Sequence, residues 1–458
     1  MEGSRGYGAV RTHVPSRPVG PQDDRGRRAR RFCSVASVVV LVASLPFVRP
    51  NILGESLSLL GFAGFAVAAV LAVAGTEGGL RRRLGPDRGA IPIAIVLGCV
   101  TAGYVWLLIQ AAGVVPGRTF QYPLQGLVLT CAALGALAIV CQDPRRRRMV
   151  GRAVVLLLVL LSASWAVTFL VWLVAGPGSA AIGAIPIRGY PEPLYFPFTP
   201  SQSSYAVLGT VYPRFTGLGR EPGWMAMYCA MAYFMTDMVG LRSRWFKIAL
   251  LLGLVGTLST AGFGVFLVVW AYHRFLRARG GISLRNYLRQ LGGLAVVGLA
   301  AWAALEAPVF GVATKSTQNA TSLGERQLAT EAGIRALTET PLGAPPTEAQ
   351  SGINLISDIS VDGLPFVLLI TAALLVPVVV MWRHRGAYGD APIYVVFLTL
   401  LLSQPPLDST WAFGMVLLVW ELRRADPAPP ERPLLPVPPI RRPAARSRFL
   451  REDLRERS

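Results

Sequence analysis

Residues 144–176 read PRRRRMVGRAVVLLLVLLSASWAVTFLVWLVAG. Four consecutive arginines, at 145–148, are followed by an apolar run at 152–175 that contains no acidic residue. A helix needs about 20 predominantly apolar residues to cross the hydrocarbon core of a bilayer, and arginine and lysine gather at the cytoplasmic ends of such helices. This stretch therefore predicts a transmembrane helix that leaves the cytoplasm at its N-terminal end.

The rest of the chain has the same character. Of its 458 residues, 53% are hydrophobic and 15% are charged, whereas soluble domains carry roughly a quarter charged residues. This composition excludes a soluble enzyme with one buried core, and it predicts an all-α fold, a polytopic bundle of about 10–12 transmembrane helices. The apolar runs fall at about 32–48, 51–75, 90–115, 122–141, 152–175, 222–240, 246–272, 290–306, 360–382 and 391–422.

The positive charge is distributed along the chain rather than gathered in one surface. A net charge of +20 is compatible with nucleic acid binding, but the arginines lie mainly between the runs and near the two ends, where they indicate cytoplasmic position. Residues 1–31 and 425–458 are rich in proline and arginine, and we expect both to be disordered cytoplasmic tails. The transmembrane domain is then 32–424, and its first run, which no clear cleavage site follows, is a retained span.

Two apolar runs have basic residues at both ends and must cross the membrane an even number of times. The runs at 246–272 and 391–422 are each predicted to form two short half-spans, with turns near 258–262 and 404–408. Non-helical backbone at membrane depth is tolerated where it lines a cavity, so both turns indicate a polar cavity open to the outer side. Both termini are then cytoplasmic, and the large external loops are about 176–221 and about 307–358.

The first external loop ends in charged residues directly before an apolar run. Arg214, Arg220 and Glu221 precede Pro222, and proline suits the first turn of a helix, where its missing N–H is not needed. Arg220 and Glu221 are thus expected at a helix N-terminus, which favours anions, and arginine presents a planar fork to phosphate oxygens. The functional interpretation is a diphosphate site; the alternative is that Arg220 pairs with Glu221 while Arg214 reaches lipid headgroups.

The second external loop carries a predicted helix and two carboxylates. Ser322 and Glu325 form a capping-box pattern for a helix that extends to about residue 338. Arg326 falls in its first turn, where the helix dipole does not favour a cation, so it is either an anion ligand or a solvated arginine. Asp358 and Asp362, at the edge of the next run, are candidate general bases; the alternative is that they mark the water boundary.

The spacing Arg214-x-x-Gly217-x-x-x-x-Pro222 resembles a motif of the O-antigen polymerase and O-antigen ligase superfamily, R-x-x-G-x-x-x-x-P-N. The resemblance covers about residues 210–370 and the many-span architecture. The later segments that follow the family's order are Leu258-Ser259-Thr260, Arg326, Pro341-Leu342-Gly343, Asn354 and Asp362-Gly363.

This resemblance implies a GT-C-like, metal-independent, inverting glycosyltransferase in the cell membrane. Such an enzyme joins polyprenyl-diphosphate-linked oligosaccharides at the outer face, in exopolysaccharide or capsule assembly. By position, Arg214 and Arg326 would hold the diphosphate, with Arg220 as an additional basic group, and stabilisation of the leaving group would supply most of the catalysis. The supporting residues carried over in the same way are Gly217, Pro222 and Asn354.

Three departures from the family pattern bear on the mechanism. The family's histidine is replaced by Ile353, its asparagine by Gly223, and the arginine after Ser259 is absent. Because the histidine is the family's proposed base, a carboxylate would have to take that role. The carboxylates that would serve are, in order of preference, Glu221, Asp358 and Asp362.

Other classes of function stay open. Broken helices and polar turns are also expected in a transporter or flippase of lipid-linked or polar substrates, and without the family histidine an inactive scaffold of a polysaccharide-assembly complex is a further alternative. The expected partners are a polyprenyl-diphosphate-linked glycan and membrane lipid, with no nucleic acid. No cofactor or metal is predicted, because the five cysteines contain no CxxC pair and the three histidines form no cluster with metal-ligand spacing.

Overall fold

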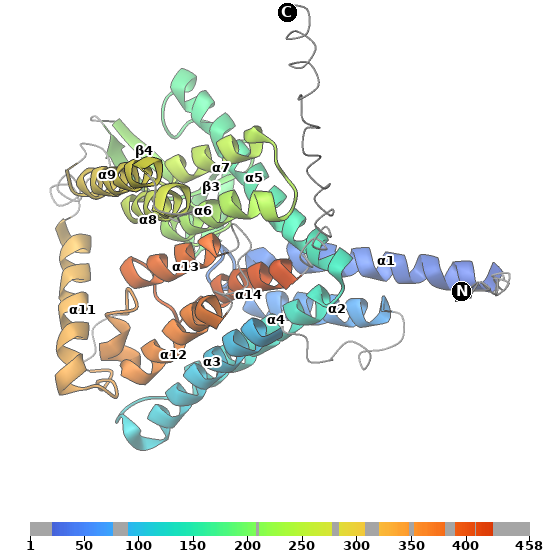
Figure 1. The fold of residues 1–458 in the computed structure, drawn as a ribbon, viewed down its shortest axis with the longest axis horizontal. Coiled ribbons are helices and arrows are strands. Elements are labelled where there is room, and N and C mark those ends of the chain that lie inside the picture. Colours follow the sequence, from blue (N-terminus) through green and yellow to red (C-terminus); the bar gives the residue numbers. More distant parts are fainter. Residues whose placement is uncertain are drawn as a thin grey trace, which may run out of the picture.

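The structure is a computed structural model that describes residues 21–76, 90–207, 210–276, 284–306, 320–347, 352–380, 390–407 and 409–424. It is a helical bundle with a small antiparallel sheet (Figure 1). The helices before the sheet are α1 (Pro21–Ala43), the short η1 (Leu45–Phe47), α2 (Ser58–Ala74), α3 (Ala90–Ile109), the π-helical η3 (Gln110–Val114), α4 (Gln121–Cys141) and α5 (Pro144–Ala175). Those after it are α6 (Pro222–Met238), α7 (Arg244–Gly256), α8 (Thr260–Ala271), the π-helical η4 (Tyr272–Leu276), α9 (Leu284–Glu306), α11 (Ala320–Glu339), α12 (Asp358–Val380), α13 (Ala391–Leu402) and α14 (Thr410–Arg424).

In the described part of the chain, four helices are long and apolar enough to cross a membrane: Ala90–Val114, Gln121–Cys141, Pro144–Ala175 and Asp358–Val380. Helices α2 and α13 are shorter but equally apolar in character. Large apolar side chains on these elements face outward, and Val70, Val128, Leu160 and Leu368 are each more than half exposed. Exposed apolar surface on this scale marks a contact with a membrane or another protein.

The centre of the bundle is formed by α6 and α14. Every residue from Trp224 to Ala232 in α6 is buried, and so is every residue of α14 from Thr410 to Leu422. A helix that is apolar all round belongs inside a protein rather than on its surface. Around this pair, α12 packs against α3, α5 against α7, α2 against α4, and α13 against α6.

The segment predicted to be the first external loop folds into a sheet, so the prediction of an all-α fold is wrong over this segment. Strands β1 (Ala181–Ile187), β2 (Tyr190–Tyr195), β3 (Thr199–Val207) and β4 (Thr210–Phe215) pair antiparallel in sequence order. Arg188 and Gly189 join β1 to β2 with φ angles of 53° and 79°, the two-residue turn that matches strand twist. Pro186, Pro191 and Pro193 obscure the strand pattern in the sequence. They are tolerated because Pro186 lies in the edge strand β1, and Pro191 and Pro193 lie in the part of β2 that pairs with β1 alone.

Both apolar runs predicted to be broken are broken. α7 ends at Gly256 and α8 begins at Thr260, and the Oγ of Ser259 accepts a hydrogen bond from the backbone N–H of Gly262 at 3.2 Å. This cap satisfies one of the free donors at the start of α8. The second run divides into α13 and α14 around a turn at 403–409, of which residue 408 is outside the described part.

The predicted N-terminal tail is partly helical. α1 begins at Pro21, so the expectation of disorder is wrong for residues 21–31. Proline suits the first helical turn, acidic residues at 23 and 24 match the positive end of the helix dipole, and arginine is a good helix former. Residues 1–20 and 425–458 of the predicted tails, and 307–319 and 348–351 of the predicted second external loop, lie outside the described residues.

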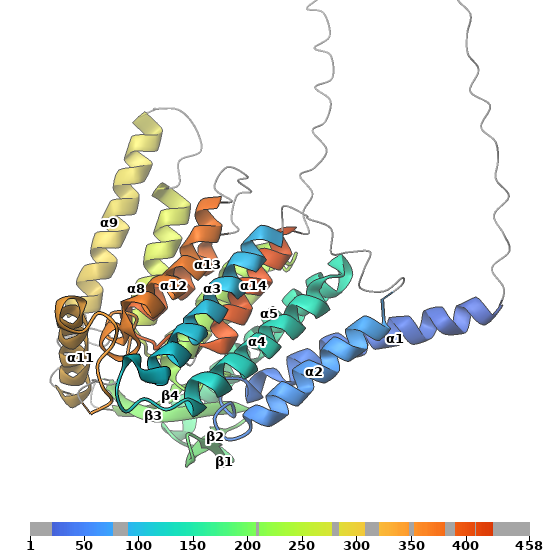
Figure 2. The ribbon, with the colours of Figure 1, turned by 90° about the horizontal axis from the view of Figure 1, so that it is seen from below.

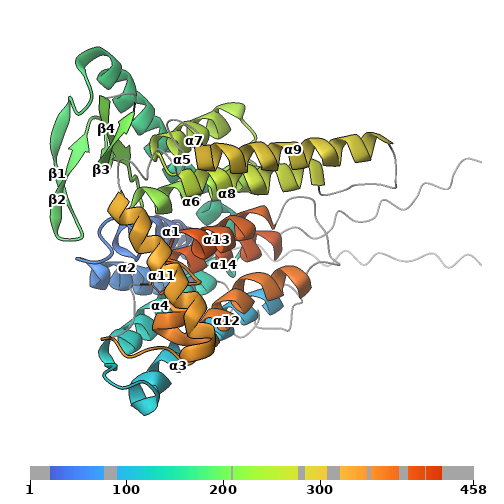
Figure 3. The same ribbon diagram turned by 90° about the vertical axis from the view of Figure 1, so that its left-hand side faces the viewer.

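The sheet and α11 occupy the same end of the bundle, which we call the sheet end. In Figure 2 the long helices run away from the sheet, and in Figure 3 α11 crosses the helix ends beside β1 and β2. The opposite end holds the start of α5 and the end of α14, which are joined there because Arg147 Nη1 donates to the carbonyl oxygen of Glu421 at 3.0 Å.

Candidate functional site

A cavity of about 540 Å³ lies at the sheet end. Its walls are the β1–β2 turn, the start of α6, α11, the start of α12 and the turn between α13 and α14. Five of the six residues predicted to bind diphosphate or act as bases line this one cavity, although they come from segments more than 100 residues apart in sequence. The charged residues that line it are Arg188, Arg220, Glu221, Glu325, Arg326, Asp358 and Asp362.

Arg220 and Glu221 are held at the junction between β4 and α6. The backbone N–H of Arg220 donates to the carbonyl oxygen of Pro50 at 2.9 Å, and its side chain, in a residue that is only 4% exposed, pairs with Glu55. Glu221 occupies the N-cap position of α6, with Pro222 in the first turn as predicted, and its carboxylate pairs with Arg188. The alternative in which Arg220 pairs with Glu221 is therefore wrong: each has a different partner.

Arg188 reaches the cavity from the tip of the β1–β2 hairpin. Its pairing with Glu221 brings the hairpin over the N-terminus of α6. Sequence reasoning did not assign it to the site, because the contact depends on a sheet that was not predicted. The Arg188-Gly189 pair itself is the signal, since two-residue hairpin turns require positive φ at both positions and glycine is preferred there.

Asp358 and Asp362 lie in the first turns of α12 and are 1% and 2% exposed. Carboxylates that are buried to this degree need hydrogen bonds or ion pairs. Asp362 has one from Arg118, whose Nη1 lies 3.3 Å from its Oδ1. Its backbone carbonyl oxygen accepts from Trp106 Nε1 at 2.9 Å and from Gln110 Nε2 at 2.8 Å. The end of α3 therefore fixes this turn of α12.

The contacts of Asp362 come from residues that sequence reasoning missed. Gln110 is fully buried inside an otherwise apolar helix, and a polar side chain in that setting is a signal that it serves a specific partner. Arg118 follows the same helix and also donates to the carbonyl oxygen of Ala344 at 3.2 Å. The α3–α4 connection is thus part of the support of the cavity.

Arg326 lines the cavity from α11, where it is exposed. α11 begins at Ala320, so the prediction that Ser322 caps the helix is wrong, and Arg326 lies in the second turn. Arg335 follows Arg326 by nine residues and so lies on the opposite face of the helix; it is exposed and is not among the residues that line the cavity. Asn354 connects α11 to the segment before α12, because its Nδ2 donates to Thr330 Oγ1 at 3.2 Å.

Arg214 is the one predicted ligand that the structure does not bring to the cavity. It lies in β4, and its Nε donates to the carbonyl oxygen of Thr257 at 3.1 Å, in the turn between α7 and α8. Gly217 has a φ of 52° and leaves no room for a side chain against Met225 and Phe215. Both residues therefore position the β4–α6 junction.

Two departures from the family pattern also lie at the cavity. Ile353, at the position of the family's histidine, lines it with an apolar side chain. Gly223, at the position of the asparagine, leaves space that the Gln404 amide occupies, since a Cβ on residue 223 would clash with Gln404 Nε2. Gln404 is 2% exposed, it lines the cavity, and its Oε1 has no hydrogen-bond partner among the described residues.

The cavity combines arginines with carboxylates and amide or hydroxyl groups. Among the described residues, three arginines and four carboxylates line it, and Ser403 and Gln404 add neutral polar groups. Arginine recognises phosphate oxygens, carboxylates accept hydrogen bonds from hydroxyl groups, and amides both accept such bonds and donate them. The lining suits a ligand that has both an anionic part and many hydroxyls. Among the described residues, no group of three His, Cys, Asp or Glu side chains could hold a metal ion.

Comparison with known proteins gives no relative. No protein-family model matches the chain, and no curated protein or solved structure matches it either.

Proposed function

We propose that this protein is a membrane-embedded glycan polymerase or ligase that joins polyprenyl-diphosphate-linked oligosaccharides at the outer face of the cell membrane. The observation that carries the proposal is the convergence of Arg220, Glu221, Arg326, Asp358 and Asp362 on one cavity. These residues were selected by chemistry and motif order, from two loops that are separated by more than 80 residues. A shared cavity supports a shared function.

In this proposal the bundle spans the membrane about 10–12 times, with both termini in the cytoplasm and the sheet end outside. The broken helix pairs α7–α8 and α13–α14 support an even number of passages in each run. The turn between α13 and α14 lines the cavity, as irregular backbone at membrane depth requires. Residues 32–424 form the membrane domain.

The proposed reaction is the inverting transfer of a glycan from diphosphate to a hydroxyl group. The acceptor oxygen attacks the anomeric carbon, the bond from that carbon to the diphosphate oxygen breaks, and the hydroxyl proton passes to Asp358 or Asp362. Arg326 and Arg220 bind the diphosphate and stabilise the charge that develops on it. The diphosphate competes with the Glu221 carboxylate for the guanidinium of Arg188, and Arg188 then also binds the diphosphate from the hairpin. In this proposal the positive charges of the arginines balance the negative charge of the diphosphate, and no metal ion takes part.

The test is complementation of a gene deletion, with the surface glycan sized for each variant. Arg326→Gln, Asp358→Asn and Asp362→Asn are expected to lower glycan joining by about 100-fold, the usual effect of removing one transition-state contact. Arg335→Gln, on the same helix but outside the cavity lining, is the matched control and is expected to give wild-type glycan. Wild-type glycan length in Arg326→Gln and in both aspartate variants would contradict the proposal.

A transporter of lipid-linked or polar substrates is the second candidate. The observation that favours it is the pair of broken helices, since discontinuous helices form substrate sites in transporters. Purified protein in lipid vesicles separates the two functions. A transporter moves a labelled lipid-linked oligosaccharide between leaflets without changing its length, whereas the transferase lengthens it. An inactive scaffold does neither.

A further inference from the structure

Gln404 carries a buried amide to which the proposed reaction gives no role. The residue is 2% exposed, it lines the cavity at the sheet end, and its Oε1 has no hydrogen-bond partner among the described residues. A buried acceptor without a partner costs free energy in the folded protein. Such a group is therefore expected to bind something that enters the cavity.

The turn between α13 and α14 holds this amide in place. The backbone N–H groups of Ser403 and Gln404 both donate to the carbonyl oxygen of Thr399, at 2.9 and 3.1 Å. The side chain of Gln404 lies against the first turn of α6, because a Cβ on Gly223 would clash with its Nε2. The amide is therefore fixed at the N-terminal end of α6, two residues beyond the cavity-lining Glu221.

The side chains of Ser403 and Gln404 both offer acceptors to a ligand. Ser403 Oγ donates its own proton to the carbonyl oxygen of Thr399 at 3.3 Å, so it can only accept a further hydrogen bond. Gln404 Oε1 is an acceptor as well. The diphosphate diester of a lipid-linked sugar has no proton to donate at neutral pH, whereas each sugar hydroxyl has one. This part of the lining therefore suits the sugar rather than the diphosphate.

The neutrality of the amide matters because the same cavity is proposed to hold a diphosphate. Arg220 and Arg326, its proposed ligands, line the cavity together with Gln404. Two of the carboxylates in the lining, Glu221 and Asp362, are paired with arginines. An additional carboxylate at position 404 would attract a hydroxyl group but repel the diphosphate. An amide accepts a hydrogen bond from the hydroxyl group without that repulsion.

We propose that Ser403 and Gln404 form the sugar-binding part of the cavity, in which Gln404 Oε1 accepts a hydrogen bond from a hydroxyl group of the sugar beside the diphosphate. This inference rests on the proposed function for the identity of the ligand as a glycan. A site that is built to bond a polar group rejects a ligand that lacks it. Gln404 thus favours the glycan-bearing lipid over the polyprenyl diphosphate that the transfer releases.

The experiment measures binding of the two parts of the substrate separately, with the full chain purified in mild detergent. The sugar probe is the oligosaccharide that mild acid releases from the polyprenyl-diphosphate pool of the cells, and the anion probe is inorganic pyrophosphate. Gln404→Met is expected to bind the oligosaccharide about fivefold more weakly, the loss of one hydrogen bond, and to bind pyrophosphate as the wild type does. Gln327→Met, exposed on α11 and outside the cavity lining, is the matched control and is expected to bind both probes as the wild type does.

A second variant is expected to change the two affinities in the opposite way. Gln404→Glu keeps an acceptor oxygen at the same reach, so it is expected to retain the oligosaccharide. Its negative charge is expected to weaken pyrophosphate binding severalfold. A purely structural role for Gln404 would shift both affinities together. Equal oligosaccharide affinity in the wild type and Gln404→Met, or an equal loss of affinity for both probes in that variant, would overturn the proposal.

The melting temperature of the ligand-free protein separates binding from folding. Gln404→Met is expected to melt no lower than the wild type, because methionine has nearly the volume of glutamine and removes a buried acceptor that has no partner. A melting temperature several degrees below that of the wild type would show that the amide stabilises the fold, and would also overturn the proposal.

Failure of this inference and failure of the proposed function are distinguishable. Oligosaccharide affinity reports the sugar-binding part of the cavity, and glycan length in complemented cells reports the transferase. A protein that binds the oligosaccharide through Gln404 but joins no glycan contradicts only the transferase. A protein that joins glycan, and whose oligosaccharide affinity is the same in the wild type and Gln404→Met, contradicts only the role of Gln404.

Discussion

Residue 223 and residue 404 compete for one space at the candidate site. The Gln404 amide lies where a side chain on Gly223 would point, so the glycine and the glutamine are complementary. In the family pattern the first of these positions carries the amide. Under the proposed function, the Gln404 amide reaches the cavity from the α13–α14 turn in place of an amide on α6.

This exchange makes a prediction about two substitutions. Gly223→Asn alone is expected to lower the melting temperature by several degrees, because overpacking a buried site costs about 1–3 kcal/mol. The double variant Gly223→Asn with Gln404→Ala is expected to recover most of that loss, since the new amide takes the vacated space. Thermal unfolding of the purified proteins measures both. Additive destabilisation in the double variant would show that the two residues do not share the space.

At the scale of the helices and strands, the position of the two aspartates in the cavity depends on the start of α12. Gly363 interrupts this helix with φ of 81° and ψ of 159°, a region that is essentially restricted to glycine. The kink turns Asp358 and Asp362 toward the cavity while the rest of α12 continues against α3. A Cβ on residue 363 would lie 2.7 Å from the carbonyl group of Leu342.

Gly363→Ala is therefore expected to destabilise the protein by about 2–4 kcal/mol. We also expect it to lower glycan joining, because the carboxylates at 358 and 362 move with the kink. Gly98→Ala is the control, since Gly98 lies inside α3 with open space around it, and alanine there is expected to be neutral or stabilising. Melting temperature and glycan length measure the two effects. An unchanged melting temperature for Gly363→Ala would show that the kink is not required.

The stability of the β1–β2 hairpin is expected to depend on pH through one residue of β2. Burial raises the pKa of Glu192 in β2, so the charged form opposes folding of the hairpin. Stability from this residue is fully present below the pKa of the unfolded chain, and it is lost as the pH rises through the higher folded pKa. Glu192→Gln is expected to slow amide hydrogen exchange in β2 at pH 7 and to have no effect near pH 4. Comparison of variant and wild type at each pH removes the intrinsic pH dependence of exchange. Equal exchange rates at pH 7 would contradict the assignment.

At the scale of the whole molecule, the sequence predicts helices better than it predicts contacts. Apolar runs and their basic ends located the broken pairs α7–α8 and α13–α14, because both signals are local. The sheet was missed since prolines in β1 and β2 interrupt the alternation. Arg118, Arg188 and Gln404 were missed as site residues because their positions depend on which distant segments meet. Residue chemistry and motif order together selected five of the cavity residues, but they could not show that Arg214 turns away toward Thr257.

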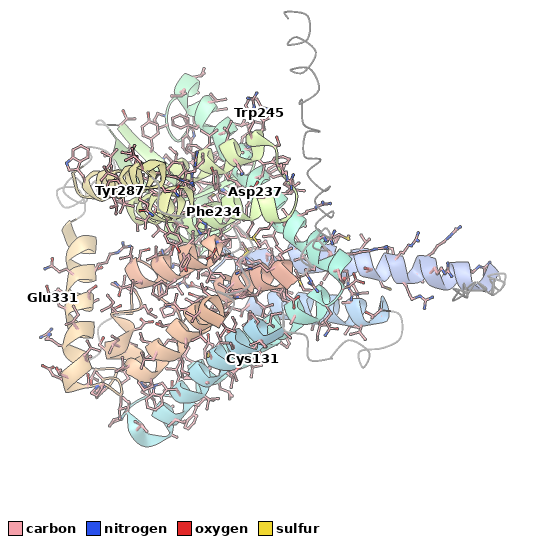
Figure 4. All side chains as sticks on the ribbon, in the orientation of Figure 1. Cys131, Phe234, Asp237, Trp245, Tyr287 and Glu331 are labelled. Atoms are coloured by element: carbon pink, nitrogen blue, oxygen red, sulfur yellow. The ribbon has the colours of Figure 1, made fainter. Side chains whose placement is uncertain are left out.

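The orientation of the bundle leads to the last prediction. Figure 4 labels Glu331 on α11 and Asp237 near the end of α6, both of which are exposed. Glu331 belongs to the sheet end with α11. Asp237 lies two residues before Val239, whose carbonyl oxygen accepts from Arg152 Nε of α5 at 2.8 Å. Because basic residues stay in the cytoplasm and the start of α5 carries residues 145–148, the sheet end is expected outside. A membrane-impermeant maleimide should label Glu331→Cys in intact cells and Asp237→Cys only after permeabilisation. The parent protein, with its native cysteines, gives the background. Labelling of Asp237→Cys in intact cells would invert the orientation and place the cavity in the cytoplasm.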